Sequence, residues 1–239
     1  LPGGLELLDY QRARHAVRRG GLKANRFTIR LRNVQGDPQT VASRLEQIRQ
    51  GVPNYFGEQR FGINGGNLER ARKLFDGTLG NPPRFERGLY LSAARSQLFN
   101  LVLAARVSDN SWNRLIGGEA VILDGSRSWF PLPDPPVDMD ERLAAFDIHP
   151  SGPLHGIGES AASGACADLE HAILAGEPRL ARGLEERLMR AERRALRLMP
   201  RDLSHEWQAQ DLVLRFDLPS GAFATVVLRE LAHLQKREG

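Results

Sequence analysis

Two segments in which apolar and polar residues alternate lie near opposite ends of the 239-residue chain, and they constrain its fold more than any other feature. Residues 26–34 read RFTIRLRNV and residues 211–218 read DLVLRFDL. A period of two predicts half-buried β-strands, and in the first segment Arg30 and Arg32 fall on the outer face. The residues between the two segments have mostly helical spacing. Strands at both ends and helices in the middle predict an α+β domain that is interrupted by a helix-rich insertion.

Apolar spacing, caps and helix breakers predict six helices in this chain. They are expected at residues 38–50, 67–75, 89–107, 158–175, 178–199 and 223–235. In the helix predicted at 178–199, Leu180, Leu184 and Leu188 lead the apolar face, and Arg and Glu side chains form a solvated opposite face. Two short strands are expected between Gly118 and Phe130.

Composition and motif searches exclude several classes of protein. A hydrophobic content of 41% and a charged content of 26% are ordinary for a folded chain. Cys166 is the only cysteine, so no disulfide within the chain is expected; this predicts a reducing, cytoplasmic location, with Cys166 as a small buried residue. No window of about 18 uncharged apolar residues predicts a membrane span. The six histidines lack ligand spacing, so we predict no metal site, and no P-loop is present.

The positive charge of the chain is concentrated at its N-terminal end. Residues 1–34 carry a net charge of +6, whereas the remaining residues sum to −2. A basic segment of this kind is typical of proteins that bind nucleic acid, and Arg suits phosphate because its planar group donates two parallel hydrogen bonds. We therefore expect Arg18, Arg19 and Lys23 to contact RNA phosphates. The alternative is a solvated, arginine-rich surface without a partner.

Residues 54–66, which read NYFGEQRFGINGG, are dense in glycine and aromatic residues and fit neither a helical nor a strand period. Phe rings beside Arg60 suit stacking on a base and contact with a phosphate. The alternative is a loop that buries its Phe side chains in the core. Phe223, at a predicted turn before the last helix, has the same two interpretations, the second being a hydrophobic staple.

Four segments resemble the TruD family of tRNA pseudouridine synthases. Residues 54–62, NYFGEQRFG, resemble the second signature motif of the family almost completely. Residues 21–27, GLKANRF, resemble its L-K-G-N-x-F segment, with Ala24 in place of the usual Gly. Residues 91–100 resemble the start of its inserted domain, and residues 218–231 resemble its third motif.

The resemblance implies an enzyme that isomerises one uridine of tRNA, at position 13 in the bacterial members, to pseudouridine. Such enzymes use an aspartate and no metal or organic cofactor, and they flip the uridine into a pocket. By match to the motifs, Asn54 and Phe223 contact the substrate, and Phe56 stacks on the base or supports it. The other motif residues expected to support the site are Gly57, Gln59, Arg60, Phe61, Gly62, Arg229 and Glu230. The expected partner is tRNA, with no membrane and no obligate protein partner.

One departure from the family concerns the aspartate, because the G-x-K-D-x-x-A type motif that carries it is not found in this chain. Asp9 is the nearest upstream candidate, but its neighbours do not match. We therefore expect the nucleophilic Asp upstream of this chain, and the chain by itself to be inactive. The expected domains are a partial catalytic domain of residues 1–79 and 198–239 and an inserted domain of residues 80–197. A non-catalytic RNA-binding protein and a plain interaction module remain as alternatives.

Overall fold

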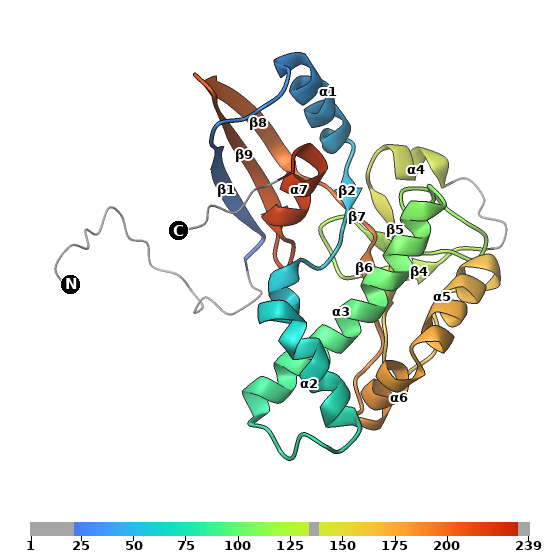
Figure 1. Cartoon of the computed structure of the whole chain (residues 1–239). Coiled ribbons are helices and arrows are strands. Elements are labelled where there is room, and N and C mark those ends of the chain that lie inside the picture. The colour runs from blue at the N-terminus through green and yellow to red at the C-terminus, as the bar shows by residue number, and fades with distance from the viewer. Residues whose placement is uncertain (1–21, 134–138, 234–239) are drawn as a thin grey trace, which may run out of the picture.

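The computed structural model describes residues 22–133 and 139–233, and within them the two alternating segments form neighbouring strands of one sheet. Strand β9 (Asp211–Pro219) lies between β1 (Ala24–Leu31) and β8 (Arg201–Gln208), and all three are antiparallel (Figure 1). Phe27 lies opposite Phe216, and their rings stack with centroids 5.7 Å apart. The α+β fold class and both predicted end strands are confirmed.

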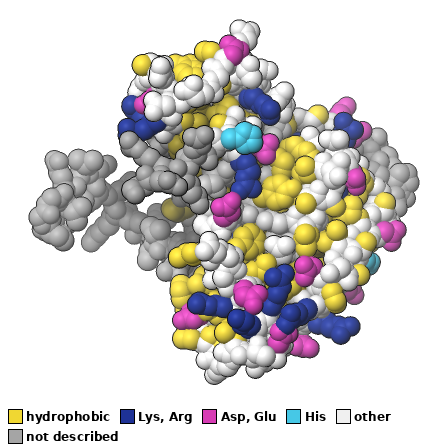
Figure 2. Space-filling model, viewed as in Figure 1, with side chains coloured by type: hydrophobic (Ala, Val, Ile, Leu, Met, Phe, Trp, Pro, Cys, Tyr) yellow, Lys and Arg dark blue, Asp and Glu magenta, His cyan; other side chains and the backbone are white. Residues whose placement is uncertain are grey.

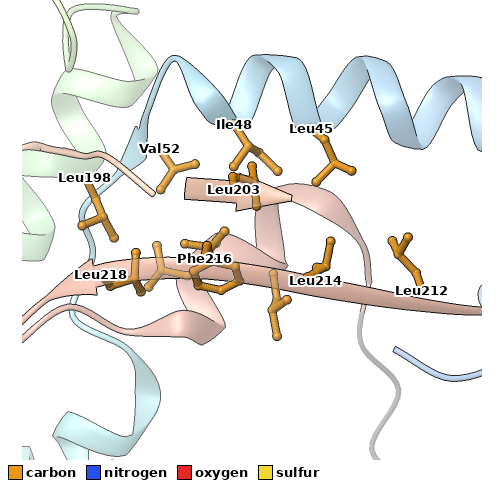
Figure 3. Close-up of a cluster of buried hydrophobic side chains, with 12 residues drawn as sticks. Leu45, Ile48, Val52, Leu198, Leu203, Leu212, Leu214, Phe216 and Leu218 are labelled. Carbon is orange, nitrogen blue, oxygen red and sulfur yellow. The ribbon is translucent and has the colours of Figure 1, made fainter. Parts of the chain in front are cut away.

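Helices α1 (Pro38–Arg49) and α7 (Ala224–Leu231) pack against this sheet. Helix α1 begins where the sequence predicts, because the Asp37 side chain accepts a hydrogen bond from the Thr40 N–H and Pro38 occupies the first turn. Leu45 and Ile48 of α1 point toward the apolar side chains of β8 and β9 (Figure 3). The buried members of this cluster are Leu45, Ile48, Val52, Leu198, Leu203, Leu212, Leu214, Phe216, Leu218, Val226, Val227 and Leu228.

A second part of the fold has a four-stranded antiparallel sheet of its own. Its strand order is β4 (Trp129–Pro131), β3 (Ala120–Leu123), β5 (Ile148–Leu154) and β6 (Glu192–Ala195). The helices of this part are α2 (Gly66–Phe75), α3 (Arg84–Ser108), α4 (Asp140–Ala144), α5 (Gly164–Gly176) and α6 (Pro178–Glu186). The long helix α3 crosses the middle of the molecule (Figure 1). No helix of the described residues is long and apolar enough to span a membrane.

Two short strands connect the two parts. Strand β2 (Val52–Pro53) pairs with β7 (Arg197–Leu198), so the chain passes from one part to the other at two adjacent points. After β2, the chain forms the 3-10 turns η1 (Glu58–Phe61) and η2 (Ile63–Gly65) before α2. The loop that bears the second motif therefore lies where the two sheets meet.

The prediction of one helix over residues 178–199 is wrong for the second half of this range. Helix α6 ends at Glu186, Leu188 adopts a left-handed φ of +55° with its side chain 72% exposed, and residues 192–195 form β6. The local Arg, Glu and Leu content favours a helix, but β5 offers a sheet edge to which β6 hydrogen-bonds, and this tertiary pairing outweighs local propensity. Strands β5 and β8 have no counterpart in the sequence-based predictions.

Buried ion pairs hold β6 in this position. Arg193 of β6 donates to Glu170 of α5 at 2.5 Å and to the carbonyl oxygen of Ser151 at 2.7 Å. A second pair, between Arg106 and Glu119 at 2.8 Å, lies beside it. Cys166 is buried with its Sγ 3.7 Å from both carboxylates, as expected of a small core residue, and burial raises the pKa of its thiol.

The side chains of α2 pack mainly toward α3 and α6. Ala71 and Leu74 share a buried cluster with Tyr90, Leu98 and Leu184. The expected boundary between residues 79 and 80 stays a proposal; α2 lies before this boundary in the sequence, but it packs on helices that lie after it.

Candidate functional site

Three segments that are distant in the sequence meet near the junction of the two sheets. They are the loop after β2, strand β6, and the turn before α7. The Phe56 ring contacts the Phe223 ring edgewise, with centroids 6.2 Å apart and planes at 67°. It also contacts Phe99 of α3, with centroids 5.4 Å apart. The fold thus brings the second and third motifs together around one aromatic cluster.

Two hydrogen bonds between the backbone of Phe56 and the side chain of Asn100 hold Phe56 in place. Its N–H donates to Oδ1 of Asn100 at 2.9 Å, and its carbonyl oxygen accepts from Nδ2 of the same side chain at 3.0 Å. The ring is half-buried, as is that of Phe223. Each ring therefore packs on the core and keeps part of its surface exposed, so the structure excludes neither interpretation of the loop.

Asn54 lies next to this cluster and is buried, with 6% of its surface exposed. Its Nδ2 donates to the carbonyl oxygen of Ala195 at 2.8 Å, and its Oδ1 accepts from Nη2 of Arg194 at 2.7 Å. Both ends of the amide are therefore occupied by the protein, and Asn54 orients the Arg194 side chain.

Two arginines flank the Phe56 ring. The guanidinium carbon of Arg194 lies 4.1 Å from the ring centroid, and that of Arg60 lies 5.3 Å from it. Arg194 also donates to the carbonyl oxygen of Gly221 at 3.2 Å, while Arg60 donates to Oγ of Ser92 at 2.8 Å. Cations in these positions are attracted by the ring quadrupole.

Within the described part of the chain, neither Arg60 nor Arg194 forms an ion pair with a carboxylate. Burial lowers the pKa of Arg60, and it lowers the pKa of Arg194 to about 9, where the positive charge of Arg60 contributes as well. Arginine side chains stay protonated in proteins, so both groups carry a positive charge. The site is therefore a partly buried cluster in which two positive charges lie against aromatic rings.

The other motif residues mainly fix the contact between the two motifs. A Cβ on Gly57 would lie 3.1 Å from Oγ1 of Thr225 and 3.4 Å from the Phe223 ring, so glycine permits this close approach. Arg229 pairs with Glu58 across the same contact at 3.3 Å.

The remaining predicted site residues lie around this contact. Gln59 is exposed and Phe61 is half-buried. Gly62 has a φ of +76°, a left-handed conformation that favours glycine. Glu230 lies near Tyr55, whose pKa is raised by burial first and by the Glu230 charge second.

Part of the basic segment falls outside the described residues, including Arg18 and Arg19. Lys23 is exposed just before β1. Arg26 and Arg30 already pair with Asp217 at 2.8 Å and Asp211 at 3.4 Å. Basic and acidic groups are interspersed on the face shown in Figure 2.

Sequence reasoning misses Arg194, Asn100 and Ser92 as members of the site. The helix predicted from the sequence places Arg194 on a solvated face, whereas β6 turns it toward Phe56. A weak signal is the alternation of Leu196 and Leu198 with charged Arg197, which is typical of a strand. No group of three or more potential metal ligands occurs among the described residues.

Aromatic rings beside two arginines, at the junction of two sheets in an α+β fold, are typical of a protein that binds unstacked nucleotides. The family comparison agrees with this class. A model of tRNA pseudouridine synthase D (TruD) matches residues 3–70 and 67–231, so the chain belongs to the TruD family.

Relatives give the same assignment, and a solved structure shares the fold. The tRNA pseudouridine synthase D of Xanthomonas campestris is 47% identical over 246 residues, which cover 96% of this chain and 67% of that protein. The protein of the same name from Hydrogenovibrio crunogenus is 42% identical over 230 residues, covering 95% and 66%. The chain therefore spans about two thirds of the length of these curated relatives. A Methanosarcina mazei crystal structure described as a TruD protein shares the fold, with a TM-score of 0.72 at 21% identity, covering 95% of this chain and 74% of that one.

Proposed function

We propose that this chain is the larger part of a tRNA pseudouridine synthase that converts one uridine, at position 13, to pseudouridine. The observation that carries the proposal is the meeting of the second and third motifs at Phe56 and Phe223. The uridine binds at the exposed sides of these rings after it is flipped out of the RNA. Phe223 contacts the base. Phe56 supports this contact, because Arg194 lies against the Phe56 ring and so covers part of it.

The reaction explains why an aromatic site is needed. The bond between N1 and C1′ breaks, the uracil turns, and a bond forms between C5 and C1′. The C5 proton then leaves to solvent and N1 takes up a proton from solvent, so substrate and product are isomers. The base is detached during this rearrangement, so the site must hold it without a covalent link to the ribose. Flat aromatic walls allow rotation while they prevent loss of the base. The atoms balance without a redox cofactor or a metal.

The nucleophilic aspartate is a further part of the proposal. No Asp in this chain has the setting of the family motif, and the relatives are about half as long again as this chain. We assign the aspartate to a segment beyond these residues. The rival within the same fold, a non-catalytic RNA-binding protein, lacks such a segment.

The remaining assignments concern the partner and the domains. Arg18, Arg19 and Lys23 contact phosphates of the tRNA. Residues 1–79 and 198–239 form part of the catalytic domain, and residues 80–197 form the inserted domain. The enzyme acts in the cytoplasm and uses no cofactor.

Pseudouridine mapping tests the proposal. An unmodified tRNA transcript is incubated with the chain and, separately, with the chain extended at its N-terminus to the length of its relatives. The extended protein is expected to form pseudouridine at position 13 and the chain alone none, with a transcript that carries cytidine at position 13 as the control. No conversion by the extended protein would leave the non-catalytic RNA-binding protein as the better description.

A further inference from the structure

Arg60 and Arg194, which lie against the same Phe56 ring, have N–H groups that donate no hydrogen bond within the described part of the chain. Each guanidinium carries five N–H groups. Arg194 donates through Nη1 to Gly221 and through Nη2 to Asn54, and Arg60 donates through Nη1 to Ser92. The Nε of each is buried without a partner among the described residues. All of the acceptors are neutral, so two positive charges share the Phe56 ring without a counter-ion in this part of the chain.

We propose that Arg60 and Arg194 together bind one RNA phosphate, that of the nucleotide whose base lies at Phe56 and Phe223. This inference rests on the proposed function and adds the group that fixes the backbone of the flipped nucleotide. The sequence already indicates that Arg60 suits contact with a phosphate, but it does not place Arg194 in the site or say which phosphate is bound.

Neutral acceptors orient both arginines, which favours an external anion as the missing partner. The Asn54 side chain and the Gly221 carbonyl oxygen accept hydrogen bonds from Arg194, and the Ser92 hydroxyl of α3 accepts one from Arg60. None of these contacts neutralises charge. Two like charges in a partly desolvated site repel each other, and one anion placed between them would offset that repulsion.

A phosphate fits this position better than a free carboxylate, since the substrate brings it. A nucleotide whose base contacts the aromatic cluster carries its phosphate covalently attached nearby. A phosphodiester offers two non-bridging oxygens, one for each guanidinium, and charge-assisted bonds from Arg to phosphate are strong. A carboxylate from another segment of a longer protein is the competing occupant, and the experiment separates the two.

The salt dependence of tRNA binding by this chain tests the inference. Affinity is measured at several salt concentrations for the wild-type chain, Arg60→Gln, Arg194→Gln and the double variant. The double variant is expected to lose about 0.7–0.9 unit of the slope of log K against log salt in total, as for one shared phosphate, and not twice that amount. Arg179→Gln, which removes an exposed arginine that is paired with Asp76, is the control and is expected to keep the wild-type slope.

Melting curves and inorganic phosphate complete the test. Because Arg194→Gln removes bonds to Asn54 and Gly221, its folding is checked by melting, and Arg60→Gln serves as the less disruptive variant. Inorganic phosphate at constant ionic strength is expected to raise the melting temperature of the wild-type chain more than that of Arg60→Gln.

An unchanged salt slope in a folded double variant would overturn the inference and favour the carboxylate. If the wild-type chain does not bind tRNA at all, the proposed function is in question. In that case the phosphate-dependent melting decides whether the anion site exists.

Discussion

At the scale of single residues, the Phe56 ring packs on the core and keeps part of its surface exposed, so packing and the proposed binding depend on the same side chain. Removing a buried Phe side chain costs about 3–5 kcal/mol, and Phe56 is only half-buried. We expect Phe56→Ala to lower the free energy of unfolding by about 2–3 kcal/mol, below that range, and to reduce pseudouridine formation by the extended protein. Urea unfolding and single-turnover rates measure the two effects.

The matched variant is Phe56→Leu, which keeps apolar volume but removes the ring that Arg194 and Arg60 contact. Its urea unfolding transition is expected to lie near that of the wild type. The extended protein with Phe56→Leu is nevertheless expected to form pseudouridine more slowly than the wild type, because the arginines lose their cation–π support. A wild-type rate in Phe56→Leu would show that the ring serves packing alone.

We expect the stability of the protein to depend on pH through the buried side chain of His149. Arg197 donates its Nε–H to Nδ1 of His149 at 2.9 Å, so the neutral imidazole carries its proton on Nε2 and donates to Asp124 at 2.9 Å. Burial lowers the pKa of His149 and outweighs the bond to Asp124, which raises it; Arg197 and Arg201 lower it further.

A lowered folded-state pKa fixes the sign of the pH effect. Below about pH 6.5 the unfolded chain takes up a proton that the folded chain resists, so the free energy of unfolding is expected to fall between about pH 7 and pH 5. Urea unfolding at both pH values measures this fall, and His149→Gln is expected to reduce it. Equal pH dependence in the two proteins would assign the response to other groups.

At the scale of elements, strand β6 shows where sequence reasoning stops. The end strands are predictable, because their alternation is strong and their inner faces are apolar. Residues 192–195 carry three charged side chains and one alanine, so they show no apolar face. Their strand conformation depends on the edge of β5 and on the buried partners of Arg193, neither of which is visible locally. Sequence reasoning misses Arg194 for the same reason.

The pair between Glu170 and Arg193 fixes β6 against α5, and its removal is expected to be costly. Breaking a buried pair from one side costs about 3–5 kcal/mol, because the other charge is left without a partner. We expect Glu170→Gln to lower the free energy of unfolding by an amount at the lower end of that range, since the amide can still accept one bond. Urea unfolding measures the loss.

Glu46→Gln is the matched control for this change. Its partner Arg49 lies one helical turn away on α1, and the Glu46 side chain is exposed. An exposed pair contributes about 0–1 kcal/mol. Equal losses in the two variants would contradict the structural role of the buried pair.

At the scale of the whole molecule, the motifs are recognisable in the sequence, but their spatial relation is not. Residues 54–62 and 218–231 are both expected in the site, and the fold brings them into contact at Gly57 and Phe223. The sequence also marks the N-terminal end as basic without revealing which charges are already paired. Asp217 and Asp211, opposite β1 in the sheet, neutralise Arg26 and Arg30.

The pairing of Arg26 and Arg30 predicts that these two residues contribute little to tRNA binding. Replacing Arg18, Arg19 and Lys23 with Gln is expected to reduce the salt slope of tRNA binding by roughly one unit for each phosphate that the variant no longer binds. Replacing Arg26 and Arg30 is expected to leave the slope unchanged. Binding isotherms at several salt concentrations measure both, and equal slopes in all variants would mean that the three residues are only solvated.

The most direct test of the central claim, that the second and third motifs form one uridine site, is a photocrosslink. A tRNA with 4-thiouridine at position 13 is bound to this chain and irradiated, and the attached peptide is identified by mass spectrometry. We predict attachment within residues 54–62 or 221–225, competed by unlabelled tRNA with uridine at position 13. Attachment only to α5, α6 or another distant surface, at saturating tRNA, would contradict the claim.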